Sequence, residues 1–386
     1  MKRGLRPVMV AIGSLALIVS AAAGQTKIPD VQSRATLSAP DIDFDLDAVA
    51  AAPGGEVWAV VVGRPRGNPT GAGTPMLASF GPGGAVTRTA LQLPSGERSV
   101  TDARRGAPRD VVKDMEVAAD GRVVLALPRW GDPPSIALVS AASKSLDTPR
   151  ALELSRDADI QKLVAVGRRL IALGTVNNRP LVAEITTEGK TIWQQTIDAA
   201  PALIDSARAT RDGGVIVLGR RGSVSQEVWL AKLSEKGSLE RSITFPARAG
   251  AVTELAGGGY AVVTDATAAR GFDVTLRLFS GDLKEQSNTP IASGQLNPAF
   301  DIAAVPSGGF VVAGTRDRGL WVTRYDSGAA VVWTDHRPPQ PPDVEMVSDL
   351  KLLGRSGTTL VLAYSAFVTE GREQRKVVRV VSFGVK

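Results

Sequence analysis

Aspartate is the residue type with which this chain could do chemistry, because the other usual catalytic groups are scarce. The sequence has no cysteine, one histidine and three tyrosines. Thiol nucleophiles, Cys-ligated metals and multi-His metal sites are therefore excluded. His336, in WTDHRPPQPPD, would need a nucleophile and an orienting carboxylate nearby to act as a general base. We expect it to be a surface loop residue instead.

Five aspartates recur seven to nine residues before a glycine-containing turn. If the repeats form a ring, these residues begin the innermost strands and surround one mouth of a central channel. Each carboxylate would then either accept backbone N–H bonds from the connection between repeats or help to bind a cation or polar ligand. These candidate ligand-binding residues are Asp47, Asp114, Asp205, Asp301 and Asp349.

The run DIDFDLD at 41–47 gathers four carboxylates on one face of an extended chain, with Ile42, Phe44 and Leu46 on the other. Such a face could bind Ca²⁺. The run lacks, however, the turn glycine and the distal carboxylate of an EF-hand loop. We expect a solvated edge here, and neither a metal nor any other cofactor in the protein.

A basic loop, RSVTDARRGAPRD at 98–110, is the candidate for a partner contact. Long insertions on a rigid scaffold commonly carry function, although isolated basic loops are also commonly just solvated. The candidate partner-binding residues are Arg98, Arg104, Arg105 and Arg109.

These residues must be positioned by a repeated element. Seven glycine-containing turns each open a short, almost wholly apolar run, such as VIVLG after Gly214 and FVVAGTR after Gly309. A period of about 40–50 residues, each holding several short strands, is typical of a β-propeller. The turn glycines are Gly55, Gly121, Gly167, Gly214, Gly259, Gly309 and Gly357, separated by 66, 46, 47, 45, 50 and 48 residues.

The spacing predicts an all-β propeller of seven blades, with six as the alternative because the first interval is long. The last repeat offers only three clear strands, so VQSRATLSA at 31–39 is expected to complete it and close the ring, since an open edge would invite aggregation. The expected blades span roughly 40–91, 108–155, 157–200, 203–247, 249–292, 297–337 and 343–386.

Two repeats, 212–239 and 307–333, resemble bacterial exported propeller repeat proteins. Their pattern is Asp-Gly-Gly, an apolar strand ending in Gly, a polar loop, and a Trp-containing strand with a basic residue. The resemblance implies turns set by glycines and inter-blade gaps filled by tryptophans, and carries over no catalytic residue. The matching residues are Asp212, Gly213, Gly214, Gly219, Trp229, Lys232 and Gly237, then Gly308, Gly309, Gly314, Trp321, Arg324, Gly328 and Trp333.

The amino-terminal residues 1–24 read as a signal peptide, with Lys2, Arg3 and Arg6 before an apolar stretch from Val8 to Ser20 and small residues after it. An uncleaved anchor is the alternative. We expect a periplasmic or secreted chain whose residues 25–386 form one domain, without membrane insertion once the signal is removed.

The charge balance excludes nucleic acid as an expected partner. Without Lys2, Arg3 and Arg6 the chain has 42 basic and 39 acidic side chains. This balance lacks the excess of positive charge that is typical of nucleic-acid-binding proteins. The sequence favours a monomeric binding or scaffold module for a protein or glycan. The alternative is a carbohydrate-active hydrolase or lyase at the channel mouth, with paired carboxylates such as Asp205 and Asp301 as acid and base.

Overall fold

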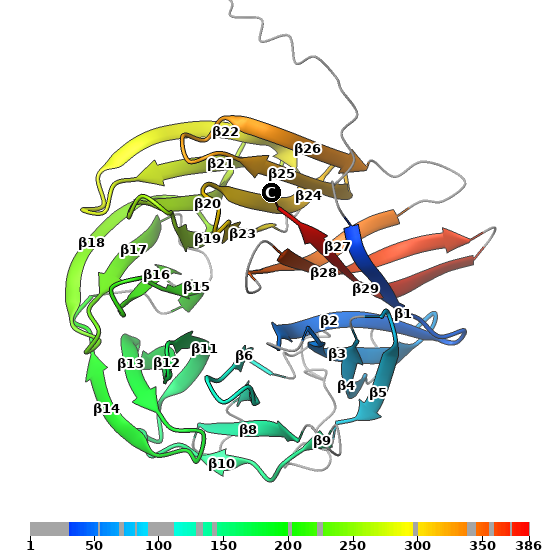
Figure 1. The fold of residues 1–386 in the computed structure, drawn as a ribbon, viewed down its shortest axis with the longest axis horizontal. Coiled ribbons are helices and arrows are strands. Elements are labelled where there is room, and N and C mark those ends of the chain that lie inside the picture. The colour runs from blue at the N-terminus through cyan, green and yellow to red at the C-terminus, as the bar shows by residue number, and fades with distance from the viewer. Residues whose placement is uncertain are drawn as a thin grey trace, which may run out of the picture.

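The chain folds into seven antiparallel sheets arranged radially around a central channel, which makes it a seven-bladed β-propeller (Figure 1). The prediction of seven blades is confirmed. No helix occurs in the ranges that the computed structural model describes. These ranges are 31–52, 55–68, 73–81, 83–91, 112–128, 134–140, 145–199, 203–221, 227–295, 300–337, 345–354, 359–370 and 373–385.

Each blade runs from an innermost strand at the channel to an outermost strand at the rim. In blade 2 the outermost position is shared by two short strands, β9 and β10, which both pair with β8. The first three blades are β2 (Ile42–Ala51), β3 (Val57–Pro65), β4 (Thr74–Phe80) and β5 (Val86–Ala90); β6 (Asp114–Val117), β7 (Val123–Leu127), β8 (Ser135–Ser140), β9 (Ser145–Leu146) and β10 (Arg150–Ala151); and β11 (Asp159–Val166), β12 (Arg169–Val176), β13 (Arg179–Ile185) and β14 (Thr191–Thr196).

The other four blades follow in chain order. They are β15 (Leu203–Ala209), β16 (Val215–Arg220), β17 (Glu227–Leu233) and β18 (Leu239–Pro246); β19 (Ala249–Glu254), β20 (Tyr260–Thr267), β21 (Phe272–Phe279) and β22 (Glu285–Gln295); β23 (Phe300–Ala304), β24 (Phe310–Arg316), β25 (Gly319–Tyr325) and β26 (Val331–Arg337); and β27 (Glu345–Gly354), β28 (Thr359–Glu370) and β29 (Glu373–Gly384), to which β1 (Val31–Leu37) is added.

Blade 7 is completed by the amino-terminal strand, as the sequence predicts. β1 pairs antiparallel with β29, so that Leu37 faces Val378 and Ala35 faces Val380. Figure 1 shows the blue β1 beside the red β29. The first and last strands of the described chain therefore share one sheet, and this pairing closes the ring.

The second strand of each blade is buried on both faces because it packs between two neighbouring blades. All five residues of β7 are buried, for example, and so are Val215–Gly219 of β16. At Gly214, a Cβ would lie 2.2 Å from the carbonyl oxygen of Leu233. Glycine is required there because the third strand passes too close for a side chain.

Seven apolar clusters hold the ring together, one at each interface between adjacent blades. The cluster between blades 3 and 4, for instance, joins Leu173 of β12 to Val217 of β16 and Trp229 of β17. Burying a side chain of this size contributes about 1.5–3 kcal/mol. The free energy of folding thus comes mainly from contacts between blades.

Each interface also contains a side-chain oxygen that accepts a backbone N–H bond from the next blade, here called the inter-blade hydrogen bond. These bonds satisfy amides that would otherwise be left unpaired near the channel. In order from blade 1 the acceptors and donors are Asp47 and Val112, Asp114 and Leu163, Gln161 and Ile204, Ser206 and Val252, Thr253 and Ala304, Asp301 and Leu352, and Ser365 and Leu46.

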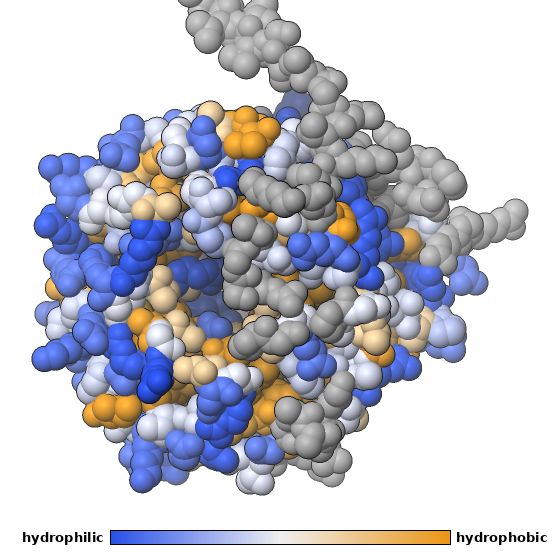
Figure 2. Space-filling model, in the orientation of Figure 1, coloured by the Kyte–Doolittle hydropathy of each residue, from blue (hydrophilic) through white to orange (hydrophobic). Residues whose placement is uncertain are grey.

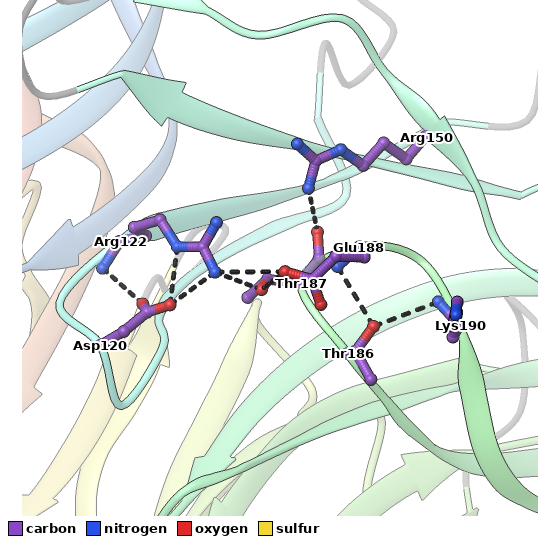
Figure 3. Close-up of polar contacts among 7 residues, drawn as sticks. All are labelled: Asp120, Arg122, Arg150, Thr186, Thr187, Glu188 and Lys190. Atoms are coloured by element: carbon purple, nitrogen blue, oxygen red, sulfur yellow. Dashed lines mark hydrogen bonds and ion pairs between the residues drawn. The ribbon is translucent and has the colours of Figure 1, made fainter.

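Arginines link neighbouring blades through their turns. Arg122, at the start of the second strand of blade 2, pairs with Asp120 and donates to Thr187 in a turn of blade 3 (Figure 3). In the same way Arg169 of blade 3 donates to the carbonyl oxygen of Glu235 in blade 4 at 2.6 Å. The turns on this side of the propeller are therefore engaged in structural contacts.

His336 lies in the outer strand β26 and not in a loop as we expected. The strand continues through Arg337, and the Nε2 atom of His336 is 3.2 Å from the carbonyl oxygen of Arg316. The part of the chain that the structure describes contains no helix long and apolar enough to cross a membrane.

Candidate functional site

The central channel is the candidate site, because it is a cavity that all seven inner strands line. Its volume is about 660 Å³, within the range of small-molecule sites. Figure 2 shows a hollow at the centre of the ring with hydrophilic residues inside it. Phe300 is the one aromatic residue among the described residues of its wall.

Four of the five predicted aspartates line this cavity: Asp47, Asp114, Asp205 and Asp301. Asp349 lies in β27, two residues before the cavity residue Lys351, and the position of its side chain is outside what the structure describes. The predicted partner-binding arginines, Arg98, Arg104, Arg105 and Arg109, also lie outside the described residues.

Three of these aspartates form inter-blade hydrogen bonds. Asp47 Oδ2 accepts from the amide of Val112 at 2.8 Å, Asp114 Oδ2 from Leu163 at 2.9 Å, and Asp301 Oδ2 from Leu352 at 2.9 Å. Asp301 Oδ1 also accepts from the amide of Ile302 at 2.9 Å. These three carboxylates therefore accept backbone N–H bonds between blades, which is the structural one of the two roles considered in the sequence analysis.

Asp205 differs from the other three. Like Asp47 it sits at a β-bulge, where the pairing of β15 with β16 shifts between Ile204 and Ser206, but it accepts no inter-blade hydrogen bond from the described residues. Its Oδ1 accepts from Arg220 Nε at 2.9 Å, but its Oδ2 is buried with no hydrogen-bond partner. Burial raises the pKa of Asp205 to about 6, against the opposing effect of the Arg220 charge.

Seven charged residues of the cavity wall were missed by the sequence analysis: Lys113, Glu116, Lys162, Arg208, Arg211, Glu254 and Lys351. Lys351 lies three residues before the end of its inner strand, as Asp114 and Asp301 do in theirs, and Lys162 lies four residues before the end of β11. Asp114, Asp301 and Lys351, from blades 2, 6 and 7, thus occupy one level of the channel, and Lys162 of blade 3 lies within one residue of it.

Both acidic and basic side chains line this part of the channel, and some of them form ion pairs. Lys162 Nζ is 4.0 Å from Asp114 Oδ1, and Arg208 Nη2 is 3.3 Å from Asp301 Oδ1. Burial lowers the pKa of Lys162, and the charges of Lys351 and Arg208 lower it further, whereas Asp114 and Asp301 oppose the shift. The cations of blades 3, 4 and 7 therefore act on one another across the channel.

Glu116 lies on β6, two residues beyond Asp114, and reaches the channel among these charges. Its Oε1 accepts from the amide of Val117 at 2.9 Å. Burial, with a smaller contribution from the Asp114 charge, raises the pKa of Glu116 to about 7. A carboxyl group that titrates near neutral pH can act as a proton donor or acceptor.

Asp43 and Asp45 of the DIDFDLD run have partners in their own blade and in blade 7. Asp45 pairs with Arg64 and Lys376, and Asp43 Oδ1 accepts from the amide of Lys376 at 2.8 Å. Phe44 is fully buried on the opposite face, as the alternation predicts. Within the described ranges, no group of three or more His, Asp or Glu side chains is arranged to hold a metal ion.

The sequence does contain a signal for the missed residues. Aligning the repeats at the ends of their inner strands places Lys351 level with Asp114 and Asp301, and Lys162 one residue away. The positions of the aspartates alone do not reveal the basic residues near the same level, and they group the bulge residue Asp205 with Asp301.

No family model and no curated protein sequence matches the chain. Solved structures do match its fold. A chain of the mitotic checkpoint complex is similar with a TM-score of 0.59 at 12% identity, covering 99% of both chains. A protein of unknown function from Dyadobacter fermentans gives a TM-score of 0.51 at 10% identity, covering 92% of this chain and 98% of that one.

The polysaccharide lyase Uly1 is also similar, with a TM-score of 0.58 at 10% identity, covering 92% of this chain and all of that one. Identities this low show a common fold and leave function open, because propellers support many functions. The chain is thus a seven-bladed β-propeller similar both to a subunit of a protein complex and to a polysaccharide-degrading enzyme.

Proposed function

We propose that the protein is an exported, monomeric binding module that receives a polar group of a glycan or protein partner in its central channel. The observation that carries this proposal is a cavity of about 660 Å³, whose wall includes charged side chains that take no part in the inter-blade hydrogen bonds. Inter-blade hydrogen bonds engage Asp47, Asp114 and Asp301, whereas Glu116 and Lys351 have no ion pair among the described residues.

A glycan fits this cavity better than a protein segment does. The volume accommodates a sugar unit, and the wall offers charged and backbone polar groups to hydroxyls. Export is supported by the basic and apolar pattern of residues 1–24. A protein partner that binds through the rim, outside the channel, is the contrasting outcome of the test.

The test is to obstruct the channel. Ala209 ends β15, is exposed and lines the cavity, so Ala209→Trp should narrow it without displacing buried atoms. Ser242→Trp adds the same ring to the exposed outer strand β18 and is the matched control. We expect binding to an immobilised panel of neutral and acidic oligosaccharides that only Ala209→Trp abolishes. Absence of binding to every glycan, with a protein captured equally by both variants, would contradict the glycan proposal.

A carbohydrate-active enzyme is the second candidate, and Glu116 is the observation that favours it. A carboxyl group with a pKa of about 7 in the same cavity as a lysine of lowered pKa resembles an acid–base site. The pair Asp205 and Asp301 is less suited, because Arg220 and the amide of Leu352 engage them. Release of reducing ends from polysaccharides, lost in Glu116→Gln, would support the enzyme over the binding module.

A further inference from the structure

We propose that Lys162, Arg208 and Lys351 form a subsite in the channel for an anionic group of the ligand, such as the carboxylate of an acidic sugar. This inference rests on the proposed function, because it specifies the ligand chemistry of the same cavity. The three side chains come from blades 3, 4 and 7, and all line the cavity wall.

Lys162, Arg208 and Lys351 converge on one cavity from three different blades. All three line the same cavity, with Lys162 Nζ 4.0 Å from Asp114 and Arg208 Nη2 3.3 Å from Asp301, and the charges of Lys351 and Arg208 both lower the pKa of Lys162. Like charges held near one another inside a cavity repel, and an anion between them removes this repulsion. The channel is therefore better suited to an anion than to a neutral group at this level.

The acids at this level offset the charges of Lys162 and Arg208 in part, and none of them forms an ion pair with Lys351 among the described residues. Asp114 and Asp301 each direct Oδ2 to a backbone amide of the next blade and only Oδ1 toward a base. The Lys162 contact is long, at 4.0 Å. Glu116, with a pKa of about 7, carries only part of a negative charge at neutral pH.

Of the three cations, Lys351 is the one best placed to bind an anion. It is exposed to the channel and forms no ion pair with any residue that the structure describes. An ammonium group in this position can bind an incoming carboxylate without first breaking another contact. The scarcity of aromatic side chains in the wall agrees with recognition by charge, because sugars bound by stacking need several of them.

The test compares two probes of equal length, tetragalacturonate and the uncharged maltotetraose, by calorimetry and by thermal unfolding of the full chain. We expect tetragalacturonate to bind and to raise the melting temperature, because a ligand of the native state stabilises it by mass action. Maltotetraose should bind at least tenfold more weakly. Sodium sulfate, against sodium chloride at equal ionic strength, distinguishes a general anion site from one that requires a sugar.

The variants are Lys351→Ala and, independently, Lys162→Met, which keeps the buried methylene groups. Each should weaken tetragalacturonate binding about tenfold and leave the fold intact. Lys236→Ala removes an exposed lysine from a turn of blade 4 and should have no effect. Unchanged affinity in both channel variants would overturn the subsite.

The two proposals fail in distinguishable ways. Equal binding of tetragalacturonate and maltotetraose, blocked by Ala209→Trp, would overturn the anionic subsite and leave the channel as a glycan site. Failure of both probes to bind would overturn the subsite and the glycan proposal together.

Discussion

Each interface between two blades contains buried apolar side chains and an inter-blade hydrogen bond, whereas the channel contains side chains whose charges are only partly paired. At each interface the accepting oxygen is paired with a backbone amide of the next blade. In the channel, Lys351 has no ion pair among the described residues, and Asp205 has one unpartnered oxygen. The difference separates residues that stabilise the ring from residues available to a ligand, and substitutions should separate them as well.

The largest effect is expected from removing β1. A chain that begins at Asp41 lacks the partner of β29 and uncovers the cluster that contains Leu37, Phe44 and Val378. We expect a loss of more than about 4 kcal/mol, or aggregation through the open edge. Thermal unfolding and size-exclusion chromatography measure it, with a chain that begins at Val31 as control. Equal melting temperatures would contradict the assignment of β1 as the closing strand.

Asp301→Ala should cost about 2–3 kcal/mol, because the amides of Leu352 and Ile302 lose their acceptor in a buried position. Asp205→Ala, in the same cavity, should cost less than about 1 kcal/mol, since no backbone donor depends on it. Chemical denaturation of both variants gives the two free energies. Similar losses would show that the distinction between the two aspartates is wrong.

Glu116→Gln should change the pH dependence of stability. The folded-state pKa is raised from 4.5 to about 7, so the folded protein binds the proton more tightly and stability falls as pH rises through this window. The variant should be about 1–2 kcal/mol more stable than wild type at pH 8 and similar at pH 4. Asp205, whose pKa is raised to about 6, adds the same trend in both proteins. Parallel stability curves would contradict a raised pKa for Glu116.

The smallest effect is expected from calcium. The carboxylates of Asp43 and Asp45 already have partners on β29, so saturating Ca²⁺ should leave the melting temperature unchanged. A rise that disappears in the double variant Asp43→Asn and Asp45→Asn would show a cation site on this edge.

The blades and their closure could be predicted from the sequence, because a propeller repeats one local pattern of turn glycine and apolar strand. The predicted fourth blade, 203–247, differs by one residue from the strands Leu203 to Pro246. The channel could not be predicted as well. Which residues meet there depends on the relative height of inner strands from different blades, and bulges at Asp47, Gln161 and Asp205 change that height by one residue. No feature of the local sequence marks these bulges.

The closing contact also has a kinetic consequence. The amide of Leu46 bonds to the hydroxyl of Ser365, 319 residues away in the sequence, and β1 pairs with a strand that is synthesised after all the other blades. Contacts of such separation form slowly, because the loop-closure entropy is paid before the contact is made. The ring can therefore be completed only after β29 has emerged, and until then β1 and blade 1 expose surfaces that require protection from other chains.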